Sequence, residues 1–262
     1  MDEITSIQNP KIKQAARLRE RRERDKTGLF LIEGYREILR AQEGGQPIER
    51  IFTCSELYLG SNEDQLIKKL NTETYSCSAS VFKKISYRDR PDGLIAVAKQ
   101  AKKKLSDLTP PNNALYIVAE AIEKPGNLGT ILRSADAAGA SGVIVCDRCT
   151  DIFNPNVIRA SVGTLFTLPV VETTSDELFP WLKKHGIAIV AATPSAENEF
   201  TEVDLTIPIA IAVGTEQLGL SKRWMEQSDV RLKIPMLGIC DSLNVATATT
   251  LLLYEAVRQR KR

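Results

Sequence analysis

Three segments of the chain combine glycine, small residues and isolated polar side chains, which is a composition typical of ligand-binding loops. They are Glu123–Asp136, Val213–Ser221 and Ile234–Thr247. Each lies where we expect a strand to give way to a helix, and open α/β sheets bind ligands at such junctions. Taken alone, each is a weak signal. In the first segment we expect Asn127 to be a helix N-cap with Arg133 in the second turn, and an ordinary surface arginine is the favoured explanation. The second segment is also explained by an ordinary strand-to-helix turn, and the third by Ser242 as a helix cap.

The residues that usually supply acid–base, metal or nucleotide chemistry are scarce. The single histidine, His185, lies at the expected end of a helix, where the helix dipole favours a cation, so we expect neither a histidine base nor a histidine metal site. Cys146 and Cys149 are spaced as C-x-x-C, but no second pair completes a zinc site. The sequence also contains no G-x-G-x-x-G and no P-loop motif. We therefore expect no metal, and any ligand of the sheet must be bound by other loops.

Positive charge is concentrated in the first part of the chain. Of the 35 Lys+Arg and 33 Asp+Glu residues, positions 1–104 hold 21 and 15, whereas positions 105–262 hold 14 and 18. Two basic clusters, at 11–26 and 83–104, suit a phosphate backbone. Acidic residues interleave the first cluster, however, so a solvated helix face explains it as well.

Length and composition restrict the class of protein. With 262 residues, 43% apolar and 26% charged, the chain has a globular composition and room for one large or two modest domains. No apolar run approaches the roughly 18 residues of a membrane span, and the acidic start after Met1 is unlike a secretory signal. We expect a cytoplasmic protein without membrane contact. The five cysteines show no pairing pattern, so we expect no disulfide framework.

The first domain is expected at residues 1–104 as a small α/β unit. Asn9 and Pro10 fit the start of a helix that would run to about Asp25. Short apolar runs, which predict strands, then alternate with helical stretches. The runs are Leu29–Ile32, Ile48–Thr53, Thr74–Cys77 and Leu94–Ala98, and the helical stretches are 34–43, 62–70 and 79–84.

The second domain is expected at residues 114–262, after a linker at 105–113 that lacks apolar periodicity. Its near-continuous aliphatic runs predict strands buried on both faces of a mostly parallel sheet. These runs are Leu115–Ala119, Gly142–Cys146, Ile187–Ala191, Ile207–Val213 and Val230–Ile234. A capping box at Thr174 and Glu177 marks the start of one helix, and the last helix should begin at about Ser242.

Together and in this order, the three segments closely resemble the three signature motifs of the SpoU (TrmH-type) family of RNA ribose 2′-O-methyltransferases, in the SPOUT superfamily. The matching residues are Asn127, Gly129 and Arg133 in the first motif, Gly214, Glu216, Gly219 and Leu220 in the second, and Pro235, Met236, Ser242, Leu243, Asn244 and Val245 in the third. The resemblance covers Leu115 to about Val257, and Asn154–Gly163 also resembles the family. Residues 1–104 look like its substrate-binding module.

The resemblance implies an α/β SPOUT fold with a deep trefoil knot, plus a small N-terminal α/β substrate-binding domain. It further implies S-adenosylmethionine as the cofactor, bound in the knot, and a homodimer formed through the catalytic domain. The residues expected to bind the cofactor are Thr193, Gly214, Gly219, Ile234, Pro235, Met236, Leu243 and Val245. Because the substrate-binding module is present, the expected substrate is structured RNA, above all ribosomal RNA. Transfer RNA is the alternative.

For catalysis, the resemblance points to a set of five polar residues. They are Arg133, Asn127, Glu216, Ser242 and Asn244. Because a guanidinium group does not give up its proton in a protein, we expect Arg133 to bind the phosphate beside the reacting ribose and to stabilise alkoxide character. Asn127 and Glu216 would orient Arg133 and the ribose, while Ser242 and Asn244 would shape the pocket. The expected RNA contacts are Arg159, Ser161, Arg21, Arg22 and Lys26.

Two interpretations from other classes stay open. A non-catalytic RNA-binding scaffold would share the basic front half, but nothing would keep the polar residues of the three motifs together. A nucleotide-dependent metabolic enzyme would account for the sheet but not for the basic clusters. Calorimetric titration with S-adenosylmethionine separates the methyltransferase from both.

Overall fold

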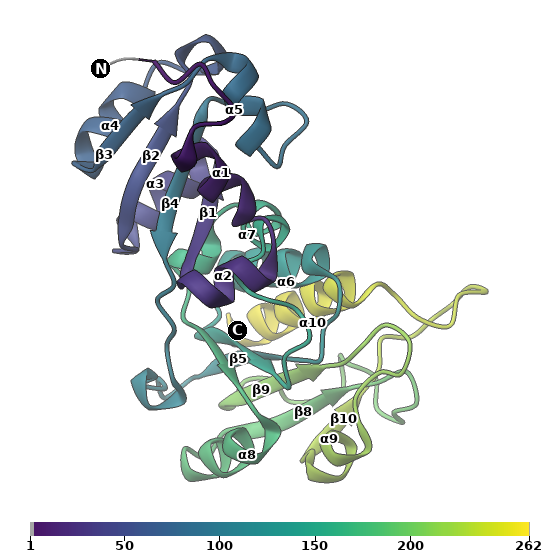
Figure 1. Cartoon of the computed structure of the whole chain (residues 1–262). Coiled ribbons are helices and arrows are strands. Elements are labelled where there is room, and N and C mark those ends of the chain that lie inside the picture. Colours follow the sequence, from purple (N-terminus) through teal and green to yellow (C-terminus); the bar gives the residue numbers. More distant parts are fainter. Residues whose placement is uncertain (1–2, 262) are drawn as a thin grey trace. The chain divides into compact units, whose positions relative to one another are not determined.

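The computed structural model describes residues 3–261, which form two compact units (Figure 1). The first unit extends to Ala101 and also includes Asp151–Thr167. The second unit comprises Lys102–Thr150 and the chain from Leu168 onward. Each unit has its own sheet and its own hydrophobic core.

The first unit is built on a mixed sheet with the strand order β1-β4-β2-β3. Its strands are β1 (Leu29–Glu33), β2 (Ile48–Thr53), β3 (Glu73–Ser76) and β4 (Leu94–Lys99). β1 and β2 are antiparallel to β4, which lies between them, and β3 is parallel to β2. The helices are α1 (Pro10–Arg17), α2 (Arg21–Thr27), α3 (Tyr35–Glu43), α4 (Glu63–Leu70), α5 (Ala79–Ile85) and α7 (Pro155–Ala160), with 3-10 turns η1 (Ser55–Leu57) and η3 (Thr164–Phe166). Ile12 of α1 and Phe82 of α5 are fully buried in the core of this unit.

The helix expected up to Asp25 is two helices, α1 and α2. Asn9 caps α1 as predicted, because its side-chain oxygen accepts a hydrogen bond of 2.9 Å from the amide of Lys11. The chain then breaks at Leu18, whose side chain is buried and whose carbonyl accepts a hydrogen bond from the Arg24 side chain. The break lets an arginine of α2 satisfy a carbonyl that the end of α1 leaves without an intrahelical partner.

The segment Asp151–Thr167 packs within the first unit, although it lies in the sequence between two strands of the second. Phe30 of β1 contacts the rings of Phe153 and Phe166, with centroid distances of 4.6 and 6.0 Å. The second compact unit therefore differs at this segment from the domain expected at 114–262. No local pattern predicts this, because the segment is held by aromatic contacts with a distant strand.

The second unit is built on a six-stranded sheet in which every neighbouring pair of strands is parallel, as predicted. The strand order is β10-β8-β9-β5-β6-β7. The strands are β5 (Leu115–Glu120), β6 (Gly142–Cys146), β7 (Val170–Thr173), β8 (Ala188–Ala192), β9 (Ile209–Val213) and β10 (Val230–Leu232). The sequence does not predict β7, because it is short and its last two residues, Glu172 and Thr173, are polar and half-buried.

Helices cover both faces of this parallel sheet, with α6 and α10 together on one side and α8 and α9 on the other (Figure 1). They are α6 (Pro125–Ala137), α8 (Ser175–Lys184), α9 (Lys222–Gln227) and α10 (Val245–Arg260). A hydrogen bond of 2.7 Å between the Ser134 and Thr250 hydroxyls joins α6 to α10. On the opposite face of the sheet, the fully buried Trp224 of α9 donates its indole N–H to the hydroxyl of Ser175 on α8 at 3.0 Å. Among the described residues, no helix is long and apolar enough to span a membrane.

Two local expectations need correction. Thr174 is the N-cap residue of α8, but it makes no side-chain cap, and Glu177 instead accepts a hydrogen bond of 2.7 Å from the Thr173 hydroxyl. Part of the linker expected at 105–113 is also structured. The 3-10 turn η2 (Leu105–Asp107) forms there, and Leu105 and Leu108 pack against the core of the second unit.

Candidate functional site

The ends of three neighbouring strands bring the sequence motifs to one edge of the parallel sheet. β10, β8 and β9 are adjacent, and parallel strands have their carboxyl ends at the same edge. Thr193 follows β8, Gly214 follows β9, and the third motif follows β10. The amide of Thr193 donates to the carbonyl of Leu232 at 2.9 Å, which links the ends of β8 and β10. β5, the neighbour of β9, leads into the first motif.

Four polar side chains from the three motifs form one hydrogen-bonded cluster around Glu216. The amide nitrogen of Asn244 lies 3.1 Å from Glu216 Oε1 and 3.2 Å from Asn127 Oδ1. Asn127 Nδ2 also donates to Glu216 Oε1, and Lys124 Nζ donates to Glu216 Oε2. The structure thus brings together Asn127, Glu216 and Asn244, of which the first and last are 117 positions apart in the chain.

The position of Asn127 corrects one expectation. α6 begins at Pro125, so Asn127 is the third residue of the helix rather than its cap. Its side chain is therefore available to donate to Glu216. Lys124, the residue before the helix, was not among the expected site residues. The available signal was its place beside the proline that begins the helix of the first motif.

Asn244 has two contacts at the start of α10. Its Oδ1 accepts a hydrogen bond of 3.0 Å from the amide of Ala246, which caps the helix, while its Nδ2 is the donor in the cluster. α10 consequently begins at Val245. The start predicted at about Ser242 is wrong. Ser242 is exposed in the preceding loop, where its hydroxyl lies 3.4 Å from Asp241 Oδ1. Within residues 3–261 it makes no hydrogen bond to the cluster.

A tight loop after β9 presents Glu216. Thr215 and Gly219 exchange two backbone hydrogen bonds of 3.0 Å, which close the loop. A Cβ atom at Gly214 would overlap the carbonyl of Gly219 and the amide nitrogen of Leu220, and Gly219 has a φ of 67°. Both glycines are therefore required by the backbone, the first for close approach and the second for its left-handed conformation.

The electrostatics of the cluster keep Glu216 ionised. The hydrogen bond from the Lys124 ammonium group lowers the pKa of Glu216 from its usual value, and the hydrogen bond from Asn127 acts in the same direction. A carboxylate with a lowered pKa is a poor general acid, but it is a stable acceptor that can orient amide side chains. Glu216 is therefore suited to positioning rather than to proton donation.

Arg133 lies on α6, further along the helix than Asn127, and its side chain is exposed. It lies in the third turn of α6, not in the second, because the helix begins before Asn127. Among the described residues, neither Asn127 nor Glu216 forms a hydrogen bond with Arg133; Glu216 is occupied by Lys124 and Asn127. The expected orientation of Arg133 by these residues is thus absent within one chain.

The residues expected to bind S-adenosylmethionine surround the same strand ends. Gly214 is buried, Thr193 and the residues of the Ile234–Met236 segment are half-buried, and Val245 is buried at the start of α10. The loop between β10 and α10 extends away from the unit (Figure 1). Apolar side chains on these loops are left uncovered. They are Leu218, Leu237, Ile239 and Leu243, which are 88%, 96%, 105% and 38% exposed.

This chemistry fits the cofactor. An adenosine-containing ligand with a short amino-acid arm needs apolar surface for its base and backbone donors and acceptors for its polar ends. The three loops supply the uncovered apolar side chains, and their backbone follows the carboxyl ends of parallel strands, where α/β sheets bind ligands. Large uncovered apolar side chains of this kind mark a surface for a ligand or a partner.

The expected RNA contacts differ in exposure. Arg159 is exposed; its guanidinium donates to Asn156 Oδ1 at 2.8 Å and lies over the Tyr87 ring at 5.9 Å. Ser161 is fully buried and its hydroxyl donates to the Ile158 carbonyl at 2.9 Å. The prediction that Ser161 contacts a phosphate is therefore wrong for this arrangement, because the hydroxyl is shielded from any ligand.

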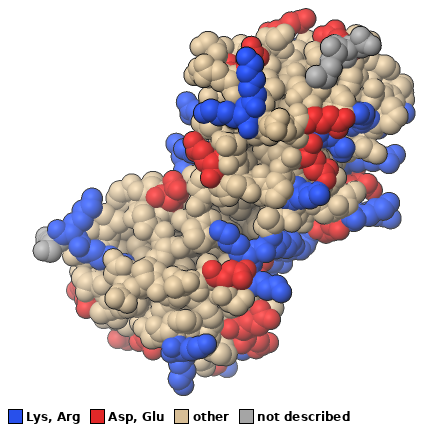
Figure 2. Space-filling view, turned by 90° about the vertical axis from the view of Figure 1, so that its left-hand side faces the viewer, with Lys and Arg blue, Asp and Glu red and all other residues tan. Residues whose placement is uncertain are grey.

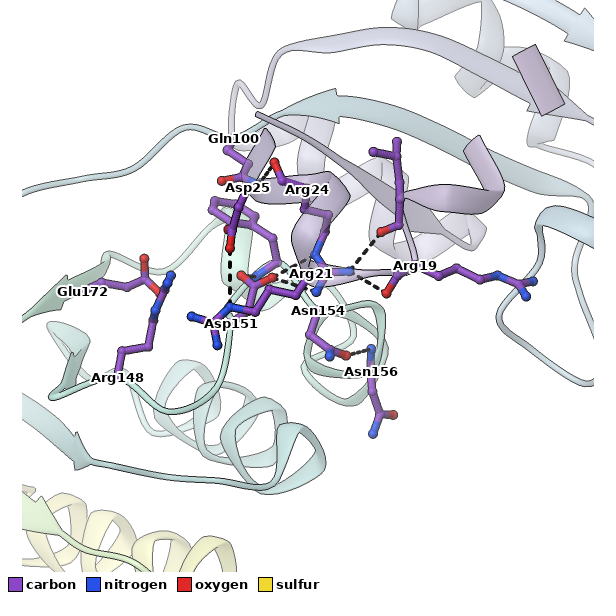
Figure 3. Close-up of polar contacts among 12 residues, drawn as sticks. Arg19, Arg21, Arg24, Asp25, Gln100, Arg148, Asp151, Asn154, Asn156 and Glu172 are labelled. Atoms are coloured by element: carbon purple, nitrogen blue, oxygen red, sulfur yellow. Dashed lines mark hydrogen bonds and ion pairs between the residues drawn. The ribbon is translucent and has the colours of Figure 1, made fainter. Parts of the chain in front are cut away.

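The basic helix α2 has one buried and several exposed cations. Arg21, Arg22 and Lys26 are exposed, as a phosphate contact requires. Arg24 points inward instead, and its Nε and Nη2 atoms each lie 2.8 Å from Asp151 Oδ2 (Figure 3). The basic residues of α2 therefore include exposed cations, which can contact RNA, and one buried arginine, which pairs with Asp151.

The described surface is not uniformly basic. On the face drawn in Figure 2, groups of Lys and Arg side chains alternate with Asp and Glu side chains. On α2 itself, Arg21 lies 3.6 Å from Asp25. On this face, therefore, the Lys and Arg side chains do not form one continuous positive surface.

The C-x-x-C pair does not have the properties of a redox motif. Cys146 is buried at the end of β6, and burial raises the pKa of its thiol to about 12. Reactive cysteines have lowered pKa values because the thiolate is the nucleophile. Within the part of the chain that the structure describes, no group of three or more His, Cys, Asp or Glu side chains could hold a metal ion.

Comparison with known proteins adds to this geometry. Residues 114–254 match the SpoU rRNA Methylase family, and residues 9–96 match the MRM3-like substrate binding domain. A 23S rRNA uridine 2′-O-methyltransferase of Streptomyces viridochromogenes is 32% identical over 94% of this chain and 88% of its own length.

Two solved structures are similar over almost their whole lengths. A crystal structure described as an RNA 2′-O ribose methyltransferase has 44% sequence identity and a TM-score of 0.89, and covers 100% of both chains. An rRNA methyltransferase from Sinorhizobium meliloti, solved with AdoMet bound, has 30% identity and a TM-score of 0.90, covering 98% of this chain and 97% of its own.

Proposed function

Because this chain belongs to the SpoU rRNA methylase family, we propose that it transfers a methyl group from S-adenosylmethionine to a ribose 2′-oxygen of structured RNA, with ribosomal RNA as the substrate class. The observation that carries the proposal is the cluster of Asn127, Glu216 and Asn244. It joins all three motifs beside the strand ends where α/β folds bind ligands. The relatives named above act on RNA and cover nearly the whole chain. We also propose a cytoplasmic location, where an enzyme of this kind would meet ribosomal RNA.

The loops after β8, β9 and β10 would hold the cofactor, whose sulfonium methyl group is the electrophile. Gly214 and Gly219 allow the second loop to fold back on itself and present backbone groups to the pocket. The Ile234–Met236 segment, Leu243 and Val245 provide apolar surface, and Thr193 closes the pocket beside β8. Threading of the loop before α10 through a knot would fix these segments in place.

Arg133 is proposed to bind the phosphate next to the reacting ribose. Its guanidinium group stays protonated, so it would stabilise negative charge on the 2′-oxygen, and the hydroxyl proton would pass to the phosphate or to water. Asn127 and Asn244, held by the ionised Glu216, would orient the ribose. Holding both reactants in line would supply a large part of the rate enhancement.

We also propose that two chains pair through their catalytic units, which would complete the site with Arg133 of the partner. Arg133 is exposed and separate from the Asn127 cluster of its own chain, which supports a role in another chain's site. α10, which packs on α6, leaves Leu251 and Tyr254 41% and 50% exposed, three residues apart on one helical face. An apolar stripe of this kind favours burial against a second copy.

The proposal is tested by titrating the full chain with S-adenosylmethionine in a calorimeter and by mapping 2′-O-methylation of ribosomal RNA. We expect one binding site per chain and one methylated nucleotide that disappears when the gene is deleted. Arg133→Ala should abolish transfer while leaving cofactor affinity nearly unchanged. If cofactor binding collapses in this variant, the role of Arg133 is wrong; if the wild-type chain binds no cofactor, the methyltransferase proposal fails.

A further inference from the structure

The first unit contains a cavity of about 770 Å³ that is separate from the cluster around Glu216. It lies among the start of α3, the start of α4, the loop before β4, and α7. Side chains of opposite charge line it. The lining residues used below are Arg36, Arg90, Arg159, Glu63 and Asp92. Its volume is in the usual range for small-ligand sites, roughly 300–1,000 Å³.

Three of the arginines are available to a ligand. Arg36, Arg90 and Arg159 are exposed, and within residues 3–261 none of them forms an ion pair. Arg88, which also lines the cavity, is different, because its guanidinium is held by Glu37 at 2.6 Å and lies 3.5 Å from Asp92. Exposed guanidinium groups that lack a carboxylate partner and line one cavity suit a phosphate, which they can bind through paired hydrogen bonds.

Two carboxylates of the lining each use only one oxygen. Glu63 Oε1 accepts a hydrogen bond of 2.8 Å from the Gly60 amide, and Asp92 Oδ2 accepts one of 3.0 Å from the Tyr35 amide. Glu63 Oε2 and Asp92 Oδ1 have no partner, although the two residues are only 4% and 8% exposed. An unpaired buried acceptor is unfavourable, so these atoms indicate where a hydrogen-bond donor belongs.

We propose that this cavity binds one unpaired nucleotide of the RNA substrate, with its phosphate on the arginines and the amino group of its base at Glu63 and Asp92. The inference rests on the proposed function, which supplies RNA as the ligand. An unpaired nucleotide is the ligand that presents an anion and base-edge donors together, and a carboxylate accepts from the amino group of a base. The contact of Arg159 with the Tyr87 ring adds a planar surface on which a neighbouring base can stack.

The test measures binding of short, labelled single-stranded oligonucleotides to the full chain by fluorescence anisotropy. We expect oligocytidylate and oligoadenylate to bind at least roughly fivefold more tightly than oligouridylate, which lacks the amino group. Glu63→Gln keeps the acceptor for Gly60 but replaces the unpaired oxygen with a donor. This variant should remove or reverse the preference for oligocytidylate and oligoadenylate over oligouridylate. It should not weaken the binding of oligouridylate.

The arginines are tested separately from the base preference. Arg36→Ala and Arg90→Ala should weaken the binding of all oligonucleotides alike. Each should also reduce the slope of log Kd against log salt concentration by about one for every phosphate that the variant no longer binds. Lys69→Ala, an exposed cation of α4 outside the cavity, is the matched control and should have little effect.

Two results would overturn the inference: equal affinity for all oligonucleotides in both wild type and Glu63→Gln, or arginine variants that behave like Lys69→Ala. Titration with S-adenosylmethionine keeps the two proposals apart. If the cofactor binds normally while the base preference is absent, the nucleotide cavity fails and the methyltransferase proposal stands. If the cofactor does not bind, the proposed function fails whatever the oligonucleotides do.

Discussion

The side-chain nitrogen of Asn244 lies 3.1 Å from Oε1 of Glu216, while the oxygen of the same side chain caps α10. One amide thus couples the start of the last helix to the loop after β9. The two contacts can be separated by substitution, because serine can cap a helix but cannot reach and donate as asparagine does.

Asn244→Ser is expected to keep the stability of the protein and to lose most of the methyl transfer. Serine and asparagine are similarly good N-cap residues, so α10 should form normally. The donor to Glu216 is removed, and the ribose is no longer oriented. Asn244→Ala removes the cap as well and should lower the free energy of unfolding by about 1 kcal/mol. Urea unfolding and transfer of labelled methyl groups measure the two effects; full activity of Asn244→Ser would remove Asn244 from the site.

Lys124→Met is expected to raise the pKa of Glu216 toward its ordinary value of 4.5. The hydrogen bond from Lys124 is the largest cause of the lowered pKa. Because the folded-state pKa is lowered, the interaction is fully present above the unfolded-state pKa and is lost as the pH falls through the folded-state value. The acid limit of activity set by Glu216 should therefore move to higher pH in the variant. Carbon NMR of the carboxyl group measures the pKa, and Lys124→Arg is the control that keeps the cation.

Gly214→Ala is expected to destabilise the loop after β9, because the new methyl group would overlap the carbonyl of Gly219. Overpacking of this kind typically costs about 1–3 kcal/mol. We expect the cofactor affinity to fall along with stability. Gly238→Ala is the matched control, since nothing lies within 4 Å of a Cβ atom there. Equal cofactor binding by the two variants would show that the close approach at Gly214 does not shape the pocket.

All strands except β7, and the meeting of the motifs, could be predicted from local sequence. Near-continuous aliphatic runs mark strands buried on both faces, and parallel strands place the residues after their ends at one edge. The bond from Lys124 to Glu216 could not be predicted, because nothing local relates positions 92 residues apart. The burial of Ser161 could likewise not be predicted, because it depends on the packing of Asp151–Thr167 in the first unit.

The residues that cap α6 and α10 could also not be predicted from local sequence. Asn127 and Ser242 both have side chains that favour helix starts, and both were expected to cap. Pro125 begins α6 two residues earlier, and Asn244 supplies the cap of α10. Several residues near each boundary could cap, and tertiary contacts decide which of them does.

Asp151→Ala is expected to lower the stability of the first unit by about 3–5 kcal/mol, because it leaves the buried Arg24 without its carboxylate. The two side chains are 4% and 1% exposed, and Arg24 is also held by the carbonyls of Leu18 and Arg19 (Figure 3). Urea unfolding of the full chain measures the change in stability.

Two variants make this last prediction specific. The double substitution of Arg24→Met with Asp151→Leu should lower the free energy of unfolding much less than Asp151→Ala alone does, because it removes both buried charges together. Asp25→Ala breaks the exposed pair with Arg21, whose side chains are 46% and 50% exposed, and should change stability by no more than about 1 kcal/mol. If Asp151→Ala were as mild as Asp25→Ala, the buried ion pair would not be what holds Asp151–Thr167 in the first unit. The aromatic contacts of Phe30 and the hydrogen bond from the Arg40 guanidinium to the Val162 carbonyl would then have to do so.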